Sequence, residues 1–261
     1  MKNEYLTDEE YDAYFFELGG VRKKLADDLL HLALRPGMRV LDVASGHGTF
    51  ACEVANLIRK GEVVGIGLRV DVEDSKSYLK EHDSYGIVKY QEMDATQMAF
   101  SDGSFDMVVN FLGLEDINMT KGREGVRGAI GEMVRVLKPG GVLEIALNVN
   151  GEEEEEVLSE EVTGYIGHNA YFYPPRFYVR ELKRHSAEVL LEKWYYTGKK
   201  LTAGQARREL RYACEMTPVV YAEYRVKCRP LDQVWERFGA RIGEHGLAMY
   251  SDILAIFARK A

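Results

Sequence analysis

The 261-residue sequence predicts an α/β fold, in which a largely parallel sheet of seven strands carries helices on both faces. Two observations support this prediction. Short apolar runs alternate with helical patterns, which is typical of βαβ units. The first apolar run, residues 38–43, leads through a loop of small residues into a helix expected over 49–60. A chain of this length can bury the core of one such domain with an elaboration.

Composition and charge indicate a globular protein, with 46% hydrophobic residues, 29% charged residues and a formal net charge of −8. No apolar stretch reaches the roughly 18 residues of a membrane helix, and the N-terminus lacks the layout of a signal peptide. The three cysteines are far apart and odd in number, as expected in a reducing compartment. We therefore expect a cytoplasmic protein with no membrane contact and no metal site.

The first 37 residues are interpreted as an N-terminal helical lid. Helices are expected over 4–18 and 21–34, with a break at Gly19 and Gly20. Aromatic side chains in this segment are expected to pack on the sheet, with contact to a substrate as the alternative. They are Tyr5, Tyr11, Tyr14, Phe15 and Phe16.

The later elements follow from turn signals and periodicity. Strands are expected over 62–68, 87–93, 105–111, 142–149, 189–196 and 247–258, and helices over 71–82, 121–137 and 176–185. Gly61 suits a helix C-cap, and Asp102-Gly103-Ser104 suits a turn before a strand. Lys138-Pro139-Gly140-Gly141 stops a helix, whereas Pro174-Pro175 begins one. Five consecutive glutamates over 152–156 indicate a solvated loop or helix start.

Three motifs resemble one family. The loop Asp42-x-Ala44-x-Gly46-x-Gly48 resembles the D-x-G-x-G-x-G signature of class I S-adenosylmethionine-dependent methyltransferases, with alanine at the first glycine. Residues 93–106 resemble that family's D-A-x-x-L-P-F-x-D-x-S-F-D segment, and the helix–K-P-G-G–strand unit is also similar. Over residues 38–149 the chain is similar to the ubiquinone/menaquinone-biosynthesis branch. The resemblance implies a Rossmann-like sheet, S-adenosylmethionine as cofactor and S-adenosylhomocysteine as product.

The same resemblance implies which residues bind the cofactor. Small residues let the loop backbone approach a nucleoside, and Asp94 is expected to accept a hydrogen bond from the adenine amino group. The family usually has an acidic residue for the ribose hydroxyls where this chain has Gly67, so Asp71, Asp74 or water is expected to replace it. The expected cofactor-binding residues are Asp42, Ala44, Ser45, Gly46, Gly48, Gly67, Leu68, Asp94, Ala95 and Asn110.

Catalysis is assigned to the end of the fourth strand. Methyl transfer from a sulfonium needs alignment and exclusion of water more than acid–base chemistry. Asn110 matches the first position of the [D/N/S]-P-P-[Y/F/W] motif of amino-group methyltransferases, and Phe111 follows it without matching. Asn110 is expected either to orient an acceptor amine or to cap the strand, and Glu115 and Asp116 either orient a polar acceptor or solvate the loop.

Basic residues gather in the last third of the chain. Residues 176–230 hold 13 Lys and Arg against six Glu and no Asp. Much of this block lies in a helical insertion, 199–246, that divides the predicted core into 38–198 and a final strand in 247–261; its helices are expected over 202–216, 219–226 and 231–245. Basic and aromatic residues together suit phosphate contact and base stacking, although a charged helical surface explains them equally. Candidate acceptor contacts are Tyr165, His168, Tyr173, Arg207, Arg208 and Arg211.

We therefore favour an RNA acceptor at the sequence level, methylated on an exocyclic amino group. The best fit is cytidine N4 of ribosomal RNA, in an enzyme similar to an archaeal one of that kind. The first alternative is a methyltransferase for a quinone-like or other small molecule. The second is a cofactor-binding partner protein without activity. The sequence does not predict the oligomeric state.

Overall fold

The computed structural model describes the backbone of residues 8–261, and the side chains of Leu18 and of residues 20–261 apart from positions 70, 73, 74 and 77. A seven-stranded sheet has the order β3-β2-β1-β4-β5-β9-β6, with β9 antiparallel to β5 and β6 and the other pairs parallel. The prediction of a Rossmann-like α/β sheet is confirmed. Its strands are β1 (Arg39–Val43), β2 (Glu62–Gly67), β3 (Val88–Glu92), β4 (Phe105–Phe111), β5 (Leu137–Asn148), β6 (Ala187–Tyr196) and β9 (Asp252–Lys260).

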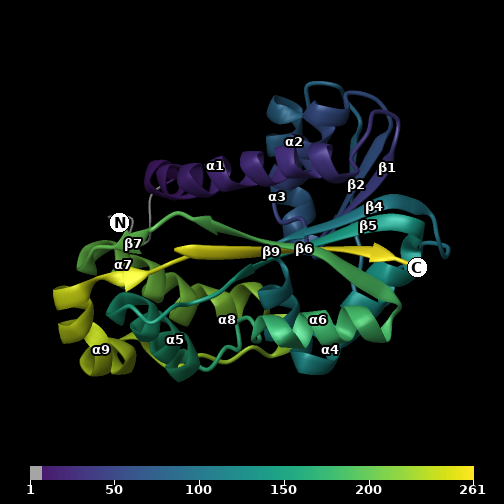
Figure 1. Cartoon of the computed structure of the whole chain (residues 1–261). Coiled ribbons are helices and arrows are strands. Elements are labelled where there is room, and N and C mark those ends of the chain that lie inside the picture. The colour runs from purple at the N-terminus through teal and green to yellow at the C-terminus, as the bar shows by residue number, and fades with distance from the viewer. Residues whose placement is uncertain (1–7) are drawn as a thin grey trace.

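Helices cover the two faces of this sheet (Figure 1). On one face lie α1 (Asp8–Leu32), α2 (Thr49–Ile58) and α3 (Arg69–His82), and on the other lie α4 (Leu114–Val136) and α6 (Pro175–Arg184). Each face has its own apolar cluster, because alternate residues of buried strands point to opposite sides. Val108 packs in the cluster beneath α4, whereas Val109 packs beneath α1 and α2.

A smaller helical unit lies at the end of the sheet where the parallel strands finish (Figure 1). A third apolar cluster joins α5, α7 and α9 and includes Leu158, Leu210 and Phe238. The acidic segment that begins α5 is therefore packed with the insertion rather than apart from it. The elements of this unit are α5 (Glu154–Ile166), β7 (Lys200–Leu201), α7 (Ala203–Arg211), a π-helical turn (Tyr212–Met216), α8 (Thr217–Val220), a 3₁₀ turn (Ala222–Tyr224), α9 (Leu231–His245) and β8 (Leu247–Ala248).

Besides the helix expected over 219–226, which is divided into α8 and a 3₁₀ turn, three predicted elements differ from the structure. The break at Gly19 and Gly20 is wrong, because α1 is continuous; burial of Leu25 and Leu29 outweighs the roughly 1 kcal/mol that a helical glycine costs. The predicted last strand is divided, since β8 pairs with β7 and Tyr250 turns the chain at φ 52° before β9. The aromatic side chains predicted to form the lid lie outside the described side chains.

The third difference concerns α4, which begins at Leu114 rather than at residue 121. Gly122 adopts a non-helical φ of 65° and kinks the helix, so a short first segment precedes the amphipathic one that the sequence predicts. Because of this earlier start, Glu115 and Asp116 lie in the first turn of a helix and not in a free loop.

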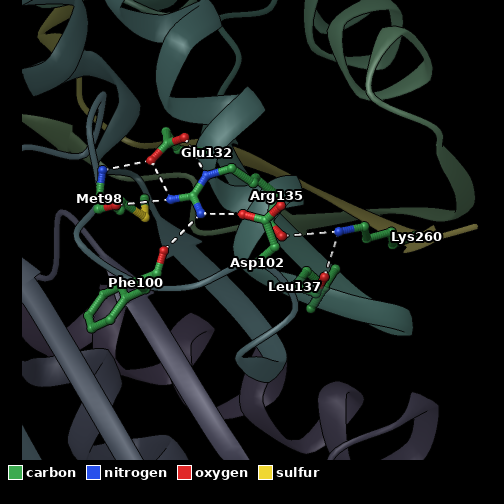
Figure 2. Close-up of polar contacts among 7 residues, drawn as sticks. All are labelled: Met98, Phe100, Asp102, Glu132, Arg135, Leu137 and Lys260. Carbon is green, nitrogen blue, oxygen red and sulfur yellow. Dashed lines mark hydrogen bonds and ion pairs between the residues drawn. The ribbon is translucent and has the colours of Figure 1, made fainter.

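Arg135 on α4 ties the loop over residues 98–102, after β3, to the rest of the domain (Figure 2). Its guanidinium donates to the carbonyl oxygens of Met98 and Phe100, at 2.9 and 2.8 Å, and pairs with Asp102 and Glu132. Glu132 also accepts the Met98 N–H at 2.6 Å. Lys260, near the C-terminus, donates to the carbonyl oxygens of Arg135 and Leu137.

The change Arg135→Met is expected to lower the free energy of unfolding by about 2 kcal/mol, because it removes several charge-assisted hydrogen bonds and keeps the aliphatic stem. Urea unfolding followed by circular dichroism measures this. Arg176→Met, at an exposed position of α6, is the matched control. Equal stability of the two variants would mean that the network in Figure 2 contributes nothing.

Candidate active site

The loop between β1 and α2 folds tightly over the end of the sheet. Ala44 has a φ of 52°, a left-handed conformation that explains why this position is usually glycine in the resembling signature. Gly113, at the start of α4, faces it closely, because a Cβ there would lie 2.5 Å from the Ala44 Cβ. Below the loop, the Ser45 hydroxyl donates to Asp42 Oδ2 at 2.5 Å. Burial raises the pKa of Asp42 to about 7, against the opposing effect of the Ser45 bond.

Gly67 ends β2 where two polar side chains converge. The Tyr90 hydroxyl, from β3, crosses above Gly67 and donates to the Gly46 carbonyl oxygen at 2.7 Å. Asp71 Oδ2 accepts the Leu68 N–H at 2.8 Å and would lie 2.8 Å from a Cβ at position 67. Asp71 therefore occupies the space that an acidic residue at position 67 would take.

Asp94 lies just beyond β3 in a fixed conformation. Its carboxylate accepts the Thr96 N–H at 2.8 Å and the Thr96 hydroxyl at 2.7 Å, and it pairs with Lys121 at 2.9 Å. Burial alone would raise the pKa of Asp94, but the bonds from Lys121 and Thr96 outweigh it and hold the pKa below its usual value. Asp94 is thus a preformed anionic acceptor.

The substitution Asp94→Ala is expected to weaken S-adenosylhomocysteine binding about tenfold, since one charged acceptor bond is worth roughly 1.5 kcal/mol or more. Titration calorimetry on the purified protein gives the dissociation constant. Glu236→Ala, on the exposed side of α9, is the control and should bind normally. If both variants bind alike, Asp94 does not contact the adenine.

Several of these residues line one cavity of about 520 Å³, open solvent at its mouth included. The lining combines the loop, the ends of β2 and β3, and the first turns of α4, and Tyr221 from the insertion reaches it as well. An adenosine linked to an amino acid needs close backbone and hydrogen-bond acceptors. Ala44 and Gly46 supply the backbone, and Asp71 and Asp94 supply carboxylate acceptors. The residues that line it are Ala44, Gly46, Ile66, Gly67, Leu68, Asp71, Met93, Asp94, Ala95, Thr96, Asp116, Ile117, Thr120, Lys121 and Tyr221.

Three further carboxylates have raised pKa values; Asp116 lines the cavity, whereas Glu115 and Glu209 lie outside its lining. Burial and the charge of Asp116 raise the pKa of Glu115, although the Tyr250 hydroxyl donates to Glu115. Burial and Asp71 raise the pKa of Asp116. Glu209, from α7, has its pKa raised to about 7 by burial. These groups were not assigned to the site from the sequence, apart from the suggestion that Glu115 and Asp116 orient an acceptor.

The two predicted catalytic residues lie beneath the cavity and not in its lining. Asn110 is fully buried, and its amide donates to the Val43 carbonyl oxygen at 2.6 Å, which ties the ends of β4 and β1 together. Phe111 packs against Phe50 with its ring centroid 5.4 Å away, on the α1 and α2 face. The geometry favours a positioning role for both. Asp42 is likewise buried below the loop.

The predicted acceptor contacts from the second half of the chain also lie outside the lining. Tyr165 packs on Phe238, with Arg229 above its ring, and the Tyr173 hydroxyl donates to Asn118 Oδ1. His168 is buried, its Nδ1 accepts the Ala170 N–H, and burial lowers its pKa to about 4. Such a histidine is neutral and structural. Arg207 stacks over Trp235, and Arg208 and Arg211 do not line the cavity either.

Two cations of the insertion form ion pairs with acids of α5. Lys200 pairs with Glu155 at 3.3 Å, and Arg241 pairs with Glu154 at 2.6 Å and Glu161 at 2.5 Å. The acidic segment and the basic block therefore partly neutralise each other across the helical unit. Net charge along the sequence did not reveal this, because the two segments are far apart in the chain.

Known proteins resemble this chain in sequence and fold. Residues 41–145 match a family described as "Methyltransferase domain". The ubiquinone/menaquinone biosynthesis C-methyltransferase of Shewanella sp. (strain ANA-3) is 35% identical over 115 residues, which make up 42% of this chain and 42% of that protein. The chain thus covers less than half the length of that relative. Magnesium protoporphyrin IX methyltransferase from Synechocystis PCC 6803, solved with S-adenosylhomocysteine, matches 98% of this chain and 88% of its own with a TM-score of 0.61 and 12% identity.

Residues 41–145 match a methyltransferase domain, and the sheet order and the left-handed loop agree with the resemblance to class I S-adenosylmethionine-dependent methyltransferases seen in the sequence. The residues that line the cavity fit S-adenosylmethionine, the cofactor that the resemblance implies. Within that class, the curated relative described above belongs to the quinone-biosynthesis branch. No helix in residues 8–261 is both long and apolar enough to cross a bilayer.

The cofactor, when bound, supplies an electrophilic methyl group on a sulfonium. The chain's own residues then have to hold and orient the two reactants and exclude water. Asp71 and Asp94 lie where they can hold the nucleoside, and Tyr90 holds the loop backbone at Gly46. Asp116, from α4, and Tyr221, from the insertion, line the same cavity.

Proposed function

We propose that this chain transfers a methyl group from S-adenosylmethionine to a small-molecule acceptor. One observation supports this most: the cavity lining holds three aspartates and Tyr221 against a single cation, Lys121, and that lysine pairs with Asp94. The aspartates are Asp71, Asp94 and Asp116. The curated relative acts in quinone biosynthesis, by its name, and is consistent with a small acceptor.

An RNA acceptor, favoured from the sequence, has less support. The carboxylates that line the cavity would repel the phosphate of a nucleotide. None of the candidate basic residues of the insertion lines the cavity, and Lys200 and Arg241 pair with acids of α5. None of the relatives described above is named as an RNA enzyme.

The test uses the purified full chain in two stages. Calorimetry first measures the binding of S-adenosylmethionine and S-adenosylhomocysteine. The protein is then incubated with methyl-tritiated S-adenosylmethionine and, separately, a low-molecular-weight cell extract, total RNA, or small ribosomal subunits from a strain lacking the gene.

Each outcome is decisive. Label in the low-molecular-weight fraction supports the proposal, and label in RNA, mapped by nucleoside mass spectrometry, replaces it with the RNA hypothesis. Cofactor binding without transfer to any fraction favours the inactive partner protein. If the protein binds neither S-adenosylmethionine nor S-adenosylhomocysteine, the proposal is overturned.

A further inference from the structure

Four carboxylates and three tyrosines gather where the cavity meets the insertion. Asp71 and Asp116 line the cavity, Glu115 adjoins Asp116 on α4, and Glu209 comes from α7. The residues act on one another electrostatically. The charge of Glu209 contributes to the raised pKa of Glu115, and the charges of Asp116, Asp71 and Glu115 contribute to the raised pKa of Tyr221. The tyrosines are Tyr212, Tyr221 and Tyr250.

Positive charge is scarce in this cluster. Lys121 lines the same cavity, but it pairs with Asp94 and lies 5.4 Å from the ring centroid of Tyr224. Within the described residues, the Asp116 carboxylate has no hydrogen-bond or ion-pair partner although it faces the cavity. Glu209 likewise has no partner there, despite its partial burial. Buried carboxylates without counter-charges cost free energy, so a ligand that supplies positive charge would be stabilised here.

We propose that the acceptor is a small amine, cationic at neutral pH, whose ammonium group binds between Glu115, Asp116 and Glu209. This inference rests on the proposed function and specifies its substrate class. The ring and hydroxyl of Tyr221, next to Asp116, complete the binding site through a cation–π contact or a hydrogen bond. Since Tyr221 and Glu209 come from the insertion, that insertion determines the acceptor.

The same carboxylates perform the proton chemistry that an amine requires. The bound ammonium gives one proton to a carboxylate of the cluster, which frees the nitrogen lone pair. The nitrogen attacks the methyl carbon, the carbon–sulfur bond breaks, and its electron pair stays on sulfur as the thioether of S-adenosylhomocysteine. The product is a methylammonium ion, and the carboxylate releases its proton to solvent. Charge and atoms balance, with one proton released per methyl group.

The experiment compares matched pairs of probes on the full chain. Phenethylamine is tested against phenethyl alcohol, and ethanolamine against ethylene glycol, with hydroquinone as a neutral aromatic acceptor. Methyl transfer from tritiated S-adenosylmethionine and thermal stabilisation in saturating S-adenosylhomocysteine are both measured. The variants are Glu115→Gln, Asp116→Asn and Glu209→Gln, and Glu236→Gln on α9 is the control.

The expected result is that amines stabilise the complex and accept label, whereas their neutral partners do neither. Each site variant should raise the amine KM at least tenfold and leave the S-adenosylhomocysteine dissociation constant within twofold. Stabilisation and methylation of hydroquinone alone, or no effect of any amine, would overturn the amine while the methyltransferase function stands. Weaker binding of S-adenosylmethionine than of S-adenosylhomocysteine in the variants, with unchanged amine KM, would assign the carboxylates to the sulfonium instead. If the wild type does not bind the cofactor at all, the result contradicts the proposed function itself.

Discussion

Replacing Gly67 with aspartate is expected to weaken cofactor binding about tenfold or more, although the resembling family usually has an acidic residue there. The reason is the space around this position. A Cβ at Gly67 would overlap the Tyr90 hydroxyl and lie 2.8 Å from Asp71 Oδ2, and the added carboxylate would also face the charge of Asp71. Overpacking of this kind costs about 1–3 kcal/mol, and moving Tyr90 would release its bond to the Gly46 carbonyl oxygen.

Calorimetry with S-adenosylhomocysteine measures the loss, and thermal unfolding measures the accompanying drop in stability. Gly243→Asp adds the same charge at an exposed helical position with open space around it, and it should bind normally. The triple variant Gly67→Asp/Asp71→Ala/Tyr90→Phe removes both obstacles and should recover part of the affinity. Full affinity in Gly67→Asp alone would mean that Asp71 is not the ribose acceptor.

Position 67 shows which features of the cavity can be predicted from the sequence. The D-x-x-x-G-x-G loop and the segment around Asp94 are local, so their spacing predicts both their structure and their place in the cavity. The absent acidic residue was visible at Gly67, and Asp71 was one of the expected replacements. Tyr90 was not foreseen, because its contact with Gly46 joins residues that are 44 positions apart.

The acceptor end was harder to predict for the same reason. Glu209 and Tyr221 meet α4 only because α5, α7 and α9 pack into one helical unit, and no local pattern encodes that contact. The basic residues, by contrast, were conspicuous in the sequence. Arg207 stacks on Trp235, and Lys200 and Arg241 pair with acids of α5, which a charge count cannot register. A charge asymmetry along the chain therefore did not indicate which charged residues line the cavity.

Buried acids also predict how the stability of the cofactor-free protein depends on pH. Burial raises the pKa of Asp42 and that of Glu209 to about 7 each, well above the values of about 4 expected in the unfolded chain. Between pH 4 and 7 the folded protein therefore binds more protons than the unfolded one, and the free energy of unfolding falls as pH rises. His168 opposes this, because its pKa, lowered to about 4, makes stability rise between pH 4 and 6.5. The lowered pKa values of Asp94 and Glu132 act below this window.

A variant comparison isolates one group from these opposing effects. Glu209→Gln removes the Glu209 titration and leaves His168 and Asp42 in place, so the loss of stability between pH 5 and pH 7.5 should shrink by about 2 kcal/mol relative to the wild type. Urea unfolding at the two pH values gives this difference, and Glu236→Gln should retain the wild-type slope. Glu115 is the titratable group whose raised pKa includes a contribution from the charge of Glu209. An unchanged slope in Glu209→Gln would mean that Glu209 is hydrated and ionised, and the amine site would then lack one of its three carboxylates.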